Sequence, residues 1–195
     1  MKMTGIILAG GKNLRMGENK AFLEINGQRI IERTRKLFQE LFAEIILVTN
    51  SPFAYLDLKL RMVTDLRPGK GALGGIFTGL FYSTYSHAFV AACDMPFLNK
   101  EMISYLISLA SKYDIVIPKT DDGLQPLHAI YSQKCLPHME NLLRQGNLKI
   151  IDFFHLVKTR EVSTNELRTF DPLQRSFFNV NTPEDLARAK ELAKF

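Results

Sequence analysis

The stretch GIILAGGKNLRMGENK, residues 5–20, decides the fold. It opens with a short apolar, β-branched run, which is typical of a buried strand. Two glycines follow at once, and an arginine and two lysines lie among the polar residues of the segment. Consecutive glycines let backbone N–H groups approach an oxyanion closely, and the basic side chains add positive charge. The stretch therefore predicts a strand that ends in a loop suited to polyphosphate.

The glycines of this loop fit neither of the two common phosphate-binding patterns. In GxxxxGK[ST] a lysine follows the second glycine, whereas here Gly17 is followed by Glu18. In GxGxxG the first two glycines are separated by one residue, whereas here they occupy positions 10 and 11. A flexible turn after the strand is the alternative to a phosphate loop. The glycine spacing alone leaves both open.

Outward from this segment, short β-branched runs alternate with segments of helical periodicity. This alternation predicts an α/β fold with a parallel sheet that is buried on both faces. Two stretches rich in turn residues, 119–125 and 146–152, interrupt it and are predicted to be insertions. The predicted strands are residues 5–8, 44–49, 61–64, 88–92, 115–117 and 127–131. The predicted helices are residues 29–42 and 73–85, one capped by Asn99, and a C-terminal one opening at Thr182 and Pro183.

Length and composition indicate one ordinary globular domain. The chain has 195 residues, of which 46% are hydrophobic and 23% charged. We therefore expect a single domain over residues 1–195. The formal charge of +5 favours anionic partners. Lysine and arginine are scattered along the chain, so nucleic acid is not an expected partner.

Cysteine usage and hydropathy predict a cytoplasmic protein. Cys93 and Cys135 lack the close spacing of a disulfide framework or a zinc site. No run approaches the ~20 apolar residues of a membrane span, and the short run near the N-terminus is unlike a signal peptide. We expect a cytoplasmic location and no membrane partner.

Polar residues directly follow three of the predicted strands. Asn50 comes after the second, Asp65 after the third and Asp94 after the wholly apolar fourth. Ligands of open α/β sheets bind at the carboxyl ends of the strands, so these side chains are candidates for a site. A carboxylate such as Asp94 can hold Mg²⁺ against substrate phosphates. The alternative for both aspartates is the capping of a turn.

Four motifs resemble the molybdenum cofactor guanylyltransferase family. They are LAGGxxxRMGxxK at residues 8–20, GALGG at 71–75, CDMPF at 93–97 and NVNTPED at 179–185. The motifs occur in the family's order and span nearly the whole chain. In the family the second motif usually has proline at the position of Ala72. Alanine there makes the loop less rigid. The resemblance implies a three-layer, Rossmann-like nucleotidyltransferase fold with a mostly parallel central sheet.

The resemblance also implies roles for individual residues. GTP would lie across the strand ends, with Asn50 and Asp65 at the nucleoside and Lys20 at the phosphates. Asp94 would hold Mg²⁺, the implied cofactor, and Arg15 would help to neutralise the triphosphate. Arg15, Lys20 and Asp94 are thus the expected catalytic residues. The implied nucleotide-binding residues are Leu8, Ala9, Gly10, Gly11, Lys20, Asn50, Asp65 and Asp94.

Two asparagines near the C-terminus form the implied acceptor site. Asn179 and Asn181 flank Val180, so on an extended segment both amides point to one face while Val180 points into the protein. In the resembling family this segment lies near the metal and the pterin phosphate, which implies that the pair holds the acceptor phosphate or a metal-bound water. The alternative is that both amides satisfy backbone groups at the turn into the C-terminal helix.

The implied reaction transfers GMP from GTP to the phosphate of molybdopterin and releases pyrophosphate. The acceptor phosphate is already largely ionised near neutral pH, so no side-chain base is required. His128 is expected to be a structural or substrate-lining residue, and Cys93 a small buried residue. Molybdopterin or its molybdenum-bearing form would be the second substrate. Molybdoenzymes and cofactor-delivery proteins are candidate partners.

Three alternatives to this reaction stay open. The chain could be a cytidylyltransferase of molybdopterin, or a transferase acting on a sugar or alditol phosphate, because all share the loop and the aspartate. It could also be a nucleotide-binding regulator that has lost turnover. The glycines at positions 10 and 11 favour the guanylyl reaction, since the cytidylyl relatives generally resemble LAAG there.

Overall fold

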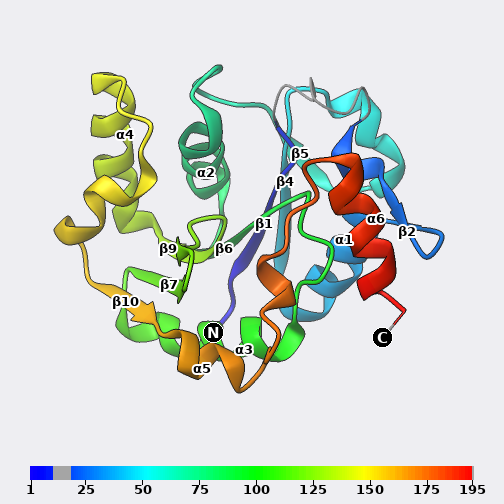
Figure 1. The fold of residues 1–195 in the computed structure, drawn as a ribbon. Coiled ribbons are helices and arrows are strands. Elements are labelled where there is room, and N and C mark those ends of the chain that lie inside the picture. The colour runs from blue at the N-terminus through cyan, green and yellow to red at the C-terminus, as the bar shows by residue number, and fades with distance from the viewer. Residues whose placement is uncertain (11–18, 195) are drawn as a thin grey trace.

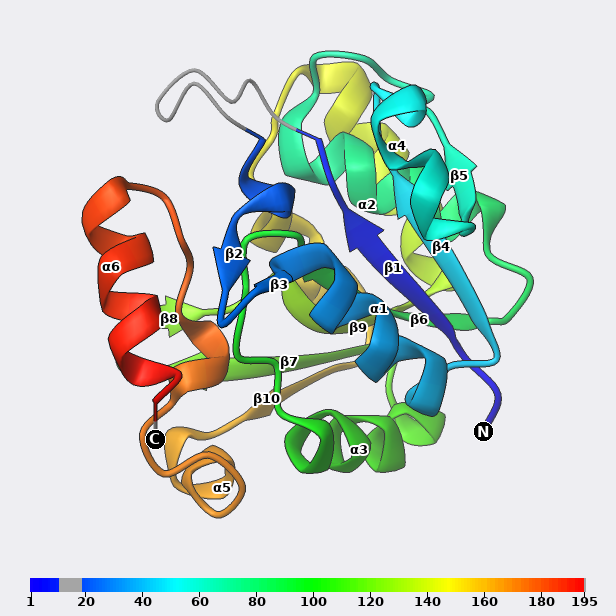
Figure 2. The same cartoon turned by 90° about the vertical axis from the view of Figure 1, so that its right-hand side faces the viewer.

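The computed structural model describes residues 1–10 and 19–194, and Figures 1 and 2 show it from two sides. The strands are β1 Thr4–Leu8, β2 Glu24–Ile25, β3 Gln28–Arg29, β4 Glu44–Val48, β5 Arg61–Val63, β6 His87–Ala92, β7 Ile115–Thr120, β8 Gly123–Leu124, β9 His128–Ser132 and β10 Thr159–Val162. The helices are α1 Ile30–Leu41, α2 Gly71–Tyr82, α3 Lys100–Leu109, α4 Leu136–Gln145, α5 Thr164–Arg168 and α6 Pro183–Leu192. Short 3₁₀ turns used below are η1 Lys20–Phe22, η2 Pro52–Leu58 and η6 Arg175–Phe177.

A mostly parallel sheet forms the centre of the molecule, as predicted. In the described part of the chain it has eight strands, in the order β10-β7-β9-β6-β1-β4-β5 with β8 paired to β7. Within this order β9 runs antiparallel to both of its neighbours. The connection from β7 to β9 is a short hairpin that contains β8, and a parallel crossover needs a dozen or more residues. β9 must therefore reverse direction.

Helices cover both faces of the sheet and give the predicted three layers. Figure 2 shows α1 and α3 in front of the sheet, with α2 and α4 behind it. On the first face Phe38 of α1 and Met102 of α3 belong to the same buried cluster as Ile7. On the second face α2 and α4 pack on a cluster that includes Ile6. A Cβ on Gly79 of α2 would lie 2.6 Å from Ile6 Cγ2, so this glycine permits the close approach of α2 to β1.

Two predicted helix starts are confirmed by their caps. The Asn99 side chain accepts a hydrogen bond from the Met102 N–H at 2.8 Å, so α3 begins where predicted. Thr182 and Asp185 form a reciprocal capping box at the start of α6, and Pro183 occupies its first turn. Both starts depend on local sequence, which is why the chain alone predicts them.

The predicted end of the second helix is wrong. The expected helix reached Tyr85, whereas α2 ends at Tyr82. Ser83 takes an extended conformation, and its hydroxyl donates to the Tyr85 carbonyl at 2.9 Å and pairs with the Thr4 hydroxyl at 2.5 Å. A contact with β1 therefore stops the helix before its apolar pattern ends.

Several elements lie beyond the prediction. The stretch 119–125 holds the end of β7 and all of β8, and 146–152 begins with Gly146, whose φ of +72° ends α4. The elements α4, α5 and β10 were not predicted. The β2–β3 hairpin and α6 enclose a third, smaller apolar cluster beside the sheet. Among the described residues, no helix combines the length and the apolar character needed to cross a bilayer.

Candidate active site

The carboxyl ends of β1, β4 and β6 lie side by side at one edge of the sheet. Hydrogen bonds continue past the strands: the Ala9 N–H donates to the Val48 carbonyl at 2.9 Å and the Cys93 N–H to the Leu8 carbonyl at 3.0 Å. Gly10 and Asp94 therefore leave the sheet from neighbouring strands. This edge therefore carries Gly10 and Asp94, and Asn50 follows β4 at the same edge.

Lys20, Asp94 and Asn181 converge at this edge. The Lys20 ammonium lies 3.7 Å from Asp94 Oδ2 and donates a hydrogen bond to Asn181 Oδ1 at 2.5 Å. The three residues come from η1, from the end of β6 and from the segment before α6. The fold thus brings together a cation, a carboxylate and an amide that are far apart in the sequence.

Backbone contacts hold the three residues in place. The Val180 N–H donates to the Asp94 carbonyl at 2.9 Å, and the Val180 side chain is fully buried, which ties the segment before α6 to the end of β6. Asn19 caps η1 by accepting the Ala21 N–H at 3.1 Å. Its amide also donates to the Tyr55 hydroxyl at 2.7 Å. The turn that carries Lys20 is therefore capped by Asn19, and Asn19 is in turn held by its hydrogen bond to Tyr55.

Asp94 is held in a poorly solvated position. Its side chain is 19% exposed. Burial raises the pKa of the Asp94 carboxyl above its ordinary value, although the nearby Lys20 ammonium acts in the opposite direction. Asp94 Oδ1 is buried and has no hydrogen-bond partner among the described residues. This oxygen is available to a cation that arrives with a ligand.

The residues present fit a divalent cation such as Mg²⁺. Magnesium usually takes one or two protein carboxylates and completes its shell with water and substrate phosphates. The orphaned Asp94 Oδ1 and the neighbouring Asn181 Oδ1 are oxygen donors of the right kind. No group of three or more His, Cys, Asp or Glu side chains in the described residues forms a metal site without a substrate.

Asn50 and Asp65 form a hydrogen-bonded pair after the ends of β4 and β5. The Asn50 amide donates to Asp65 Oδ2 at 2.9 Å, and the Asp65 N–H donates to Asn50 Oδ1 at 3.2 Å. The second carboxylate oxygen, Oδ1, is buried and has no partner within the described part of the chain. A Cβ on Gly75 of α2 would lie 3.3 Å from Leu8 Cδ2 and 3.9 Å from Asp65 Oδ1. Gly75 therefore lets α2 approach Leu8 of β1 and the Asp65 carboxylate closely.

The two acceptor candidates differ in their surroundings. The Asn179 amide donates to the Phe177 carbonyl at 3.2 Å, which is the backbone role described above as the alternative. The N–H groups of Asn181 and Thr182 both donate to the Asp185 carboxylate at 2.9 Å. The turn into α6 is therefore satisfied without the Asn181 side chain, whose oxygen faces Lys20 instead.

Gly11 and Arg15, the remaining predicted site residues, lie outside the described residues. The same holds for most of the loop that follows β1. Leu8, Ala9 and Gly10 are described, and they place the start of the loop at the edge that holds Lys20 and Asp94.

Cys93 and His128 are poor candidates for a nucleophile or a base. Burial raises the pKa of the Cys93 thiol to about 12, so the reactive thiolate is scarce at neutral pH. His128 is fully buried, with the rings of Phe89 and Phe177 each 5.1 Å from its own ring. Burial lowers the pKa of His128 to about 3, and the imidazole is neutral.

Sequence reasoning missed Asn19 and Tyr55. Asn19 precedes the short turn that carries Lys20, and asparagine is a common capping residue, so a local signal was present. Tyr55 lies on η2, in a stretch with no recognisable motif. Only the contact with Asn19 shows that Tyr55 supports the site.

Comparison with known proteins identifies the family. A family model described as a MobA-like NTP transferase domain matches residues 5–159. A probable molybdenum cofactor guanylyltransferase from Pelotomaculum thermopropionicum is 40% identical and covers 100% of this chain and 95% of its own length. The molybdenum cofactor guanylyltransferase of Desulfosudis oleivorans is 37% identical, over 98% of this chain and 96% of its own length.

A solved structure agrees with these relatives. The crystal structure of molybdopterin-guanine dinucleotide biosynthesis protein A from Archaeoglobus fulgidus matches with a TM-score of 0.85 at 29% identity, over 98% of this chain and 99% of that one. The shared fold and the full-length similarity agree. The chain therefore belongs to the MobA-like NTP transferase family and is a nucleotidyltransferase of its molybdenum cofactor guanylyltransferase group.

Proposed function

We propose that the chain, as a single domain over residues 1–195, transfers GMP from GTP to the terminal phosphate of molybdopterin. The products are molybdopterin guanine dinucleotide and pyrophosphate. The observation that carries the proposal is the convergence of Lys20, Asp94 and Asn181 at the strand ends. The names of the relatives support the guanylyl group and the molybdenum cofactor. The cytoplasmic location stays a prediction, and so does Mg²⁺ as the cofactor.

The bond changes need little acid–base chemistry. An oxygen of the acceptor phosphate attacks the α-phosphorus of GTP, and the bond to the β-phosphate breaks as pyrophosphate leaves. The acceptor oxygen is already ionised near neutral pH, so no base removes a proton. This agrees with the neutral thiol of Cys93 and the buried His128. Catalysis then depends on position and on the stabilisation of negative charge.

Different residues of the chain bind the phosphates, the metal and the nucleoside. Lys20 neutralises charge on the triphosphate, and Asp94 would hold Mg²⁺, which when bound supplies further positive charge to the phosphates. Backbone N–H groups of the loop that starts at Gly10 bind phosphate oxygens. Asn50 and Asp65, which fix each other, bind the nucleoside. We retain Arg15 and Gly11 as loop residues of this site.

We assign Asn181 to the acceptor phosphate or to a metal-bound water. Its oxygen faces Lys20 at 2.5 Å, and the backbone turn beside it is satisfied by Asp185. Asn179, whose amide is engaged by the Phe177 carbonyl, contributes less to acceptor binding.

GTP with Mg²⁺ is expected to stabilise the protein more than ATP, CTP or UTP. A ligand that binds only the folded state stabilises it by about 2.7 kcal/mol at a concentration of 100 Kd. Thermal unfolding with each of the four nucleotides measures this. Stabilisation by CTP that exceeds that by GTP would replace the guanylyl assignment with the cytidylyl one. Release of pyrophosphate from GTP only when molybdopterin is added then tests the acceptor.

Asn181→Ala is expected to separate acceptor binding from structure. Guanylyl transfer should fall by about tenfold or more, because an interaction made with the acceptor is lost, while the affinity for GTP changes little. Asn179→Ala is the matched variant and should lose less transfer. Pyrophosphate release per folded molecule, together with urea unfolding, measures both. Lower stability with normal transfer in Asn181→Ala would show a purely structural role.

A further inference from the structure

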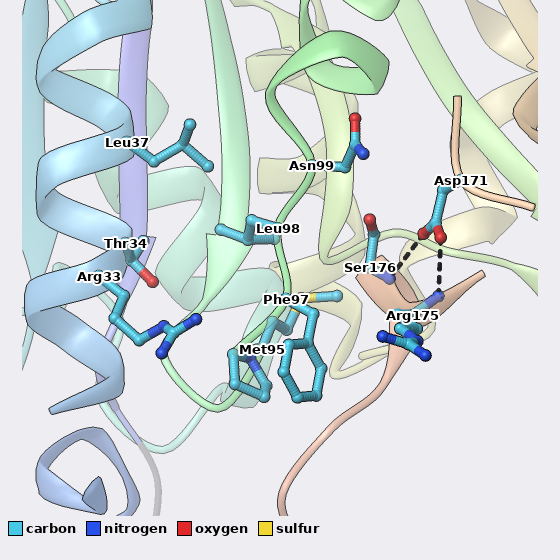
Figure 3. Close-up of a pocket in the computed structure, with 11 residues that line it drawn as sticks. Arg33, Thr34, Leu37, Met95, Phe97, Leu98, Asn99, Asp171, Arg175 and Ser176 are labelled. Carbon is cyan, nitrogen blue, oxygen red and sulfur yellow. Dashed lines mark hydrogen bonds between the residues drawn. The ribbon is translucent and has the colours of Figure 1, made fainter. Parts of the chain in front are cut away.

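A pocket of about 400 Å³ lies on the α1 side of the sheet, apart from the cluster at the strand ends. Figure 3 shows that three segments wall it: α1, the chain after β6, and η6 with the residues that precede it. Neither Lys20 nor Asp94 nor Asn181 lines it. Phe97, which does, packs on the small apolar cluster that contains Val180. The pocket therefore adjoins the proposed catalytic edge, because its wall begins at Met95, but none of the three converging side chains lines it.

Two neighbouring residues of this pocket carry unsatisfied hydrogen-bond donors. Ser176 is fully buried, and its Oγ has no hydrogen-bond partner among residues 1–10 and 19–194. Nε of Arg175 is likewise buried and without a partner in the same part of the chain. Buried donors without acceptors cost free energy, and most native structures avoid them. Nε of Arg35 is also without a partner among the described residues but lies outside the pocket, whereas Arg175 and Ser176 line it, so an acceptor oxygen of a ligand bound there would satisfy them.

Positive charge predominates around the pocket. Arg33 and Arg175 lie on opposite sides of Phe97 (Figure 3). Their guanidinium groups donate to backbone carbonyls, Arg33 to Ile25 at 3.5 Å and Arg175 to Leu192 at 3.2 Å. Neither forms a salt bridge with a carboxylate of the described residues.

The other polar groups of the wall are already engaged. The Asp171 carboxylate accepts the N–H groups of Arg175 at 3.1 Å and Ser176 at 2.8 Å, which stabilises its negative charge. The Asn99 amide caps α3 and donates to the Phe170 carbonyl at 3.2 Å. Two guanidinium groups and one carboxylate therefore line the pocket, so the net charge of its lining is positive and favours an anion.

We infer that this pocket is a binding site for a small organic anion, a carboxylate or a phosphate ester with a compact apolar body. The guanidinium of Arg33, Nε of Arg175 and the Ser176 hydroxyl supply donors for the anionic group. Leu37, Phe97 and Leu98 supply apolar contacts for the body. The volume of about 400 Å³ suits a small molecule.

Phenyl phosphate and benzoate are the probes, with benzyl alcohol as the uncharged control. Each is titrated into the ¹⁵N-labelled protein with and without GTP and Mg²⁺, because the nucleotide keeps phosphate away from Lys20. We expect amide shifts in residues 95–99 and 171–176 for at least one anion and none for benzyl alcohol. Response to benzoate alone assigns a carboxylate, and response to phenyl phosphate alone a phosphate ester.

Variants distinguish the site from general attraction of anions. Arg33→Met and Ser176→Ala should each weaken binding of the responding anion by about tenfold. Arg35→Met is the matched control, because it removes the same charge from the same helix but its guanidinium donates to the Leu58 carbonyl, outside the pocket. Urea unfolding checks that each variant is folded.

Two results would overturn the inference. One is the absence of shifts in residues 95–99 and 171–176 at millimolar anion. The other is equal weakening by Arg33→Met and Arg35→Met, which would show long-range attraction only. The amide shifts do not depend on turnover, so a failure of guanylyl transfer would leave this test unaffected. Shifts confined to the strand ends would count against binding in the pocket.

Discussion

Replacement of Asp94 by asparagine is expected to leave the fold intact and to lower guanylyl transfer by about 10³-fold. The amide has nearly the shape of the carboxylate but lacks the charge that attracts a divalent cation. The orphaned Oδ1 and the closeness of Lys20, at 3.7 Å, place this charge at the centre of the proposed site. Single-turnover pyrophosphate release at saturating GTP, Mg²⁺ and molybdopterin measures the loss.

The stability of the same variant tests whether Asp94 is instead a structural turn residue. Burial raises the pKa of Asp94 in the folded protein, so the folded state favours the protonated carboxyl. The associated stability is present below the unfolded pKa and is lost as the pH rises through the folded one. Without metal, Asp94→Asn should therefore be at least as stable as the wild type at pH 7, and the difference should vanish at low pH.

Urea unfolding in chelator at several pH values measures this contrast. A structural role predicts the opposite sign, with Asp94→Asn less stable at pH 7. A variant that keeps a tenth of the wild-type rate would remove Asp94 from the proposed metal site.

Lys20→Met has the second large expected effect, with opposite consequences for the nucleotide and the metal. Transfer should fall by about 10²-fold and GTP affinity should drop, because a positive charge that faces the phosphates is lost. In the free protein, however, the ammonium lies near the Asp94 carboxylate, which is proposed to hold the cation, and donates to Asn181. Removal of this charge should raise the affinity for free Mn²⁺ by about tenfold.

Electron paramagnetic resonance of unbound Mn²⁺ measures the metal affinity without nucleotide. Lys194→Met is a suitable control, because Lys194 pairs with Glu191 on the exposed end of the chain. It should change neither metal affinity nor transfer. Wild-type kinetics together with wild-type Mn²⁺ affinity in Lys20→Met would exclude Lys20 from the site.

Local sequence determined which segments became strands and helices around the site. Three features depend only on residues close in sequence: the apolar run of β1, the cap at Asn99 and the capping box of Thr182 and Asp185. They can therefore be predicted from the sequence. The rule that ligands bind at the carboxyl ends of parallel strands then predicted where Asn50 and Asp94 would lie. The mostly parallel sheet and the strand-end site followed from these signals.

Tertiary structure decided the features that depend on contacts between distant segments. Ser83 ends α2 early because its hydroxyl meets Thr4 of β1. The contact between Lys20 and Asn181 joins residues 161 positions apart, and no local pattern encodes it. Asn179 and Asn181 have the same residue type and neighbouring positions, yet one amide binds a carbonyl and the other faces the ammonium. The sequence alone determined the layers and the edge that carries the site, because those depend on local periodicity. Only the folded chain determined which side chains meet there, because that depends on how separate elements pack.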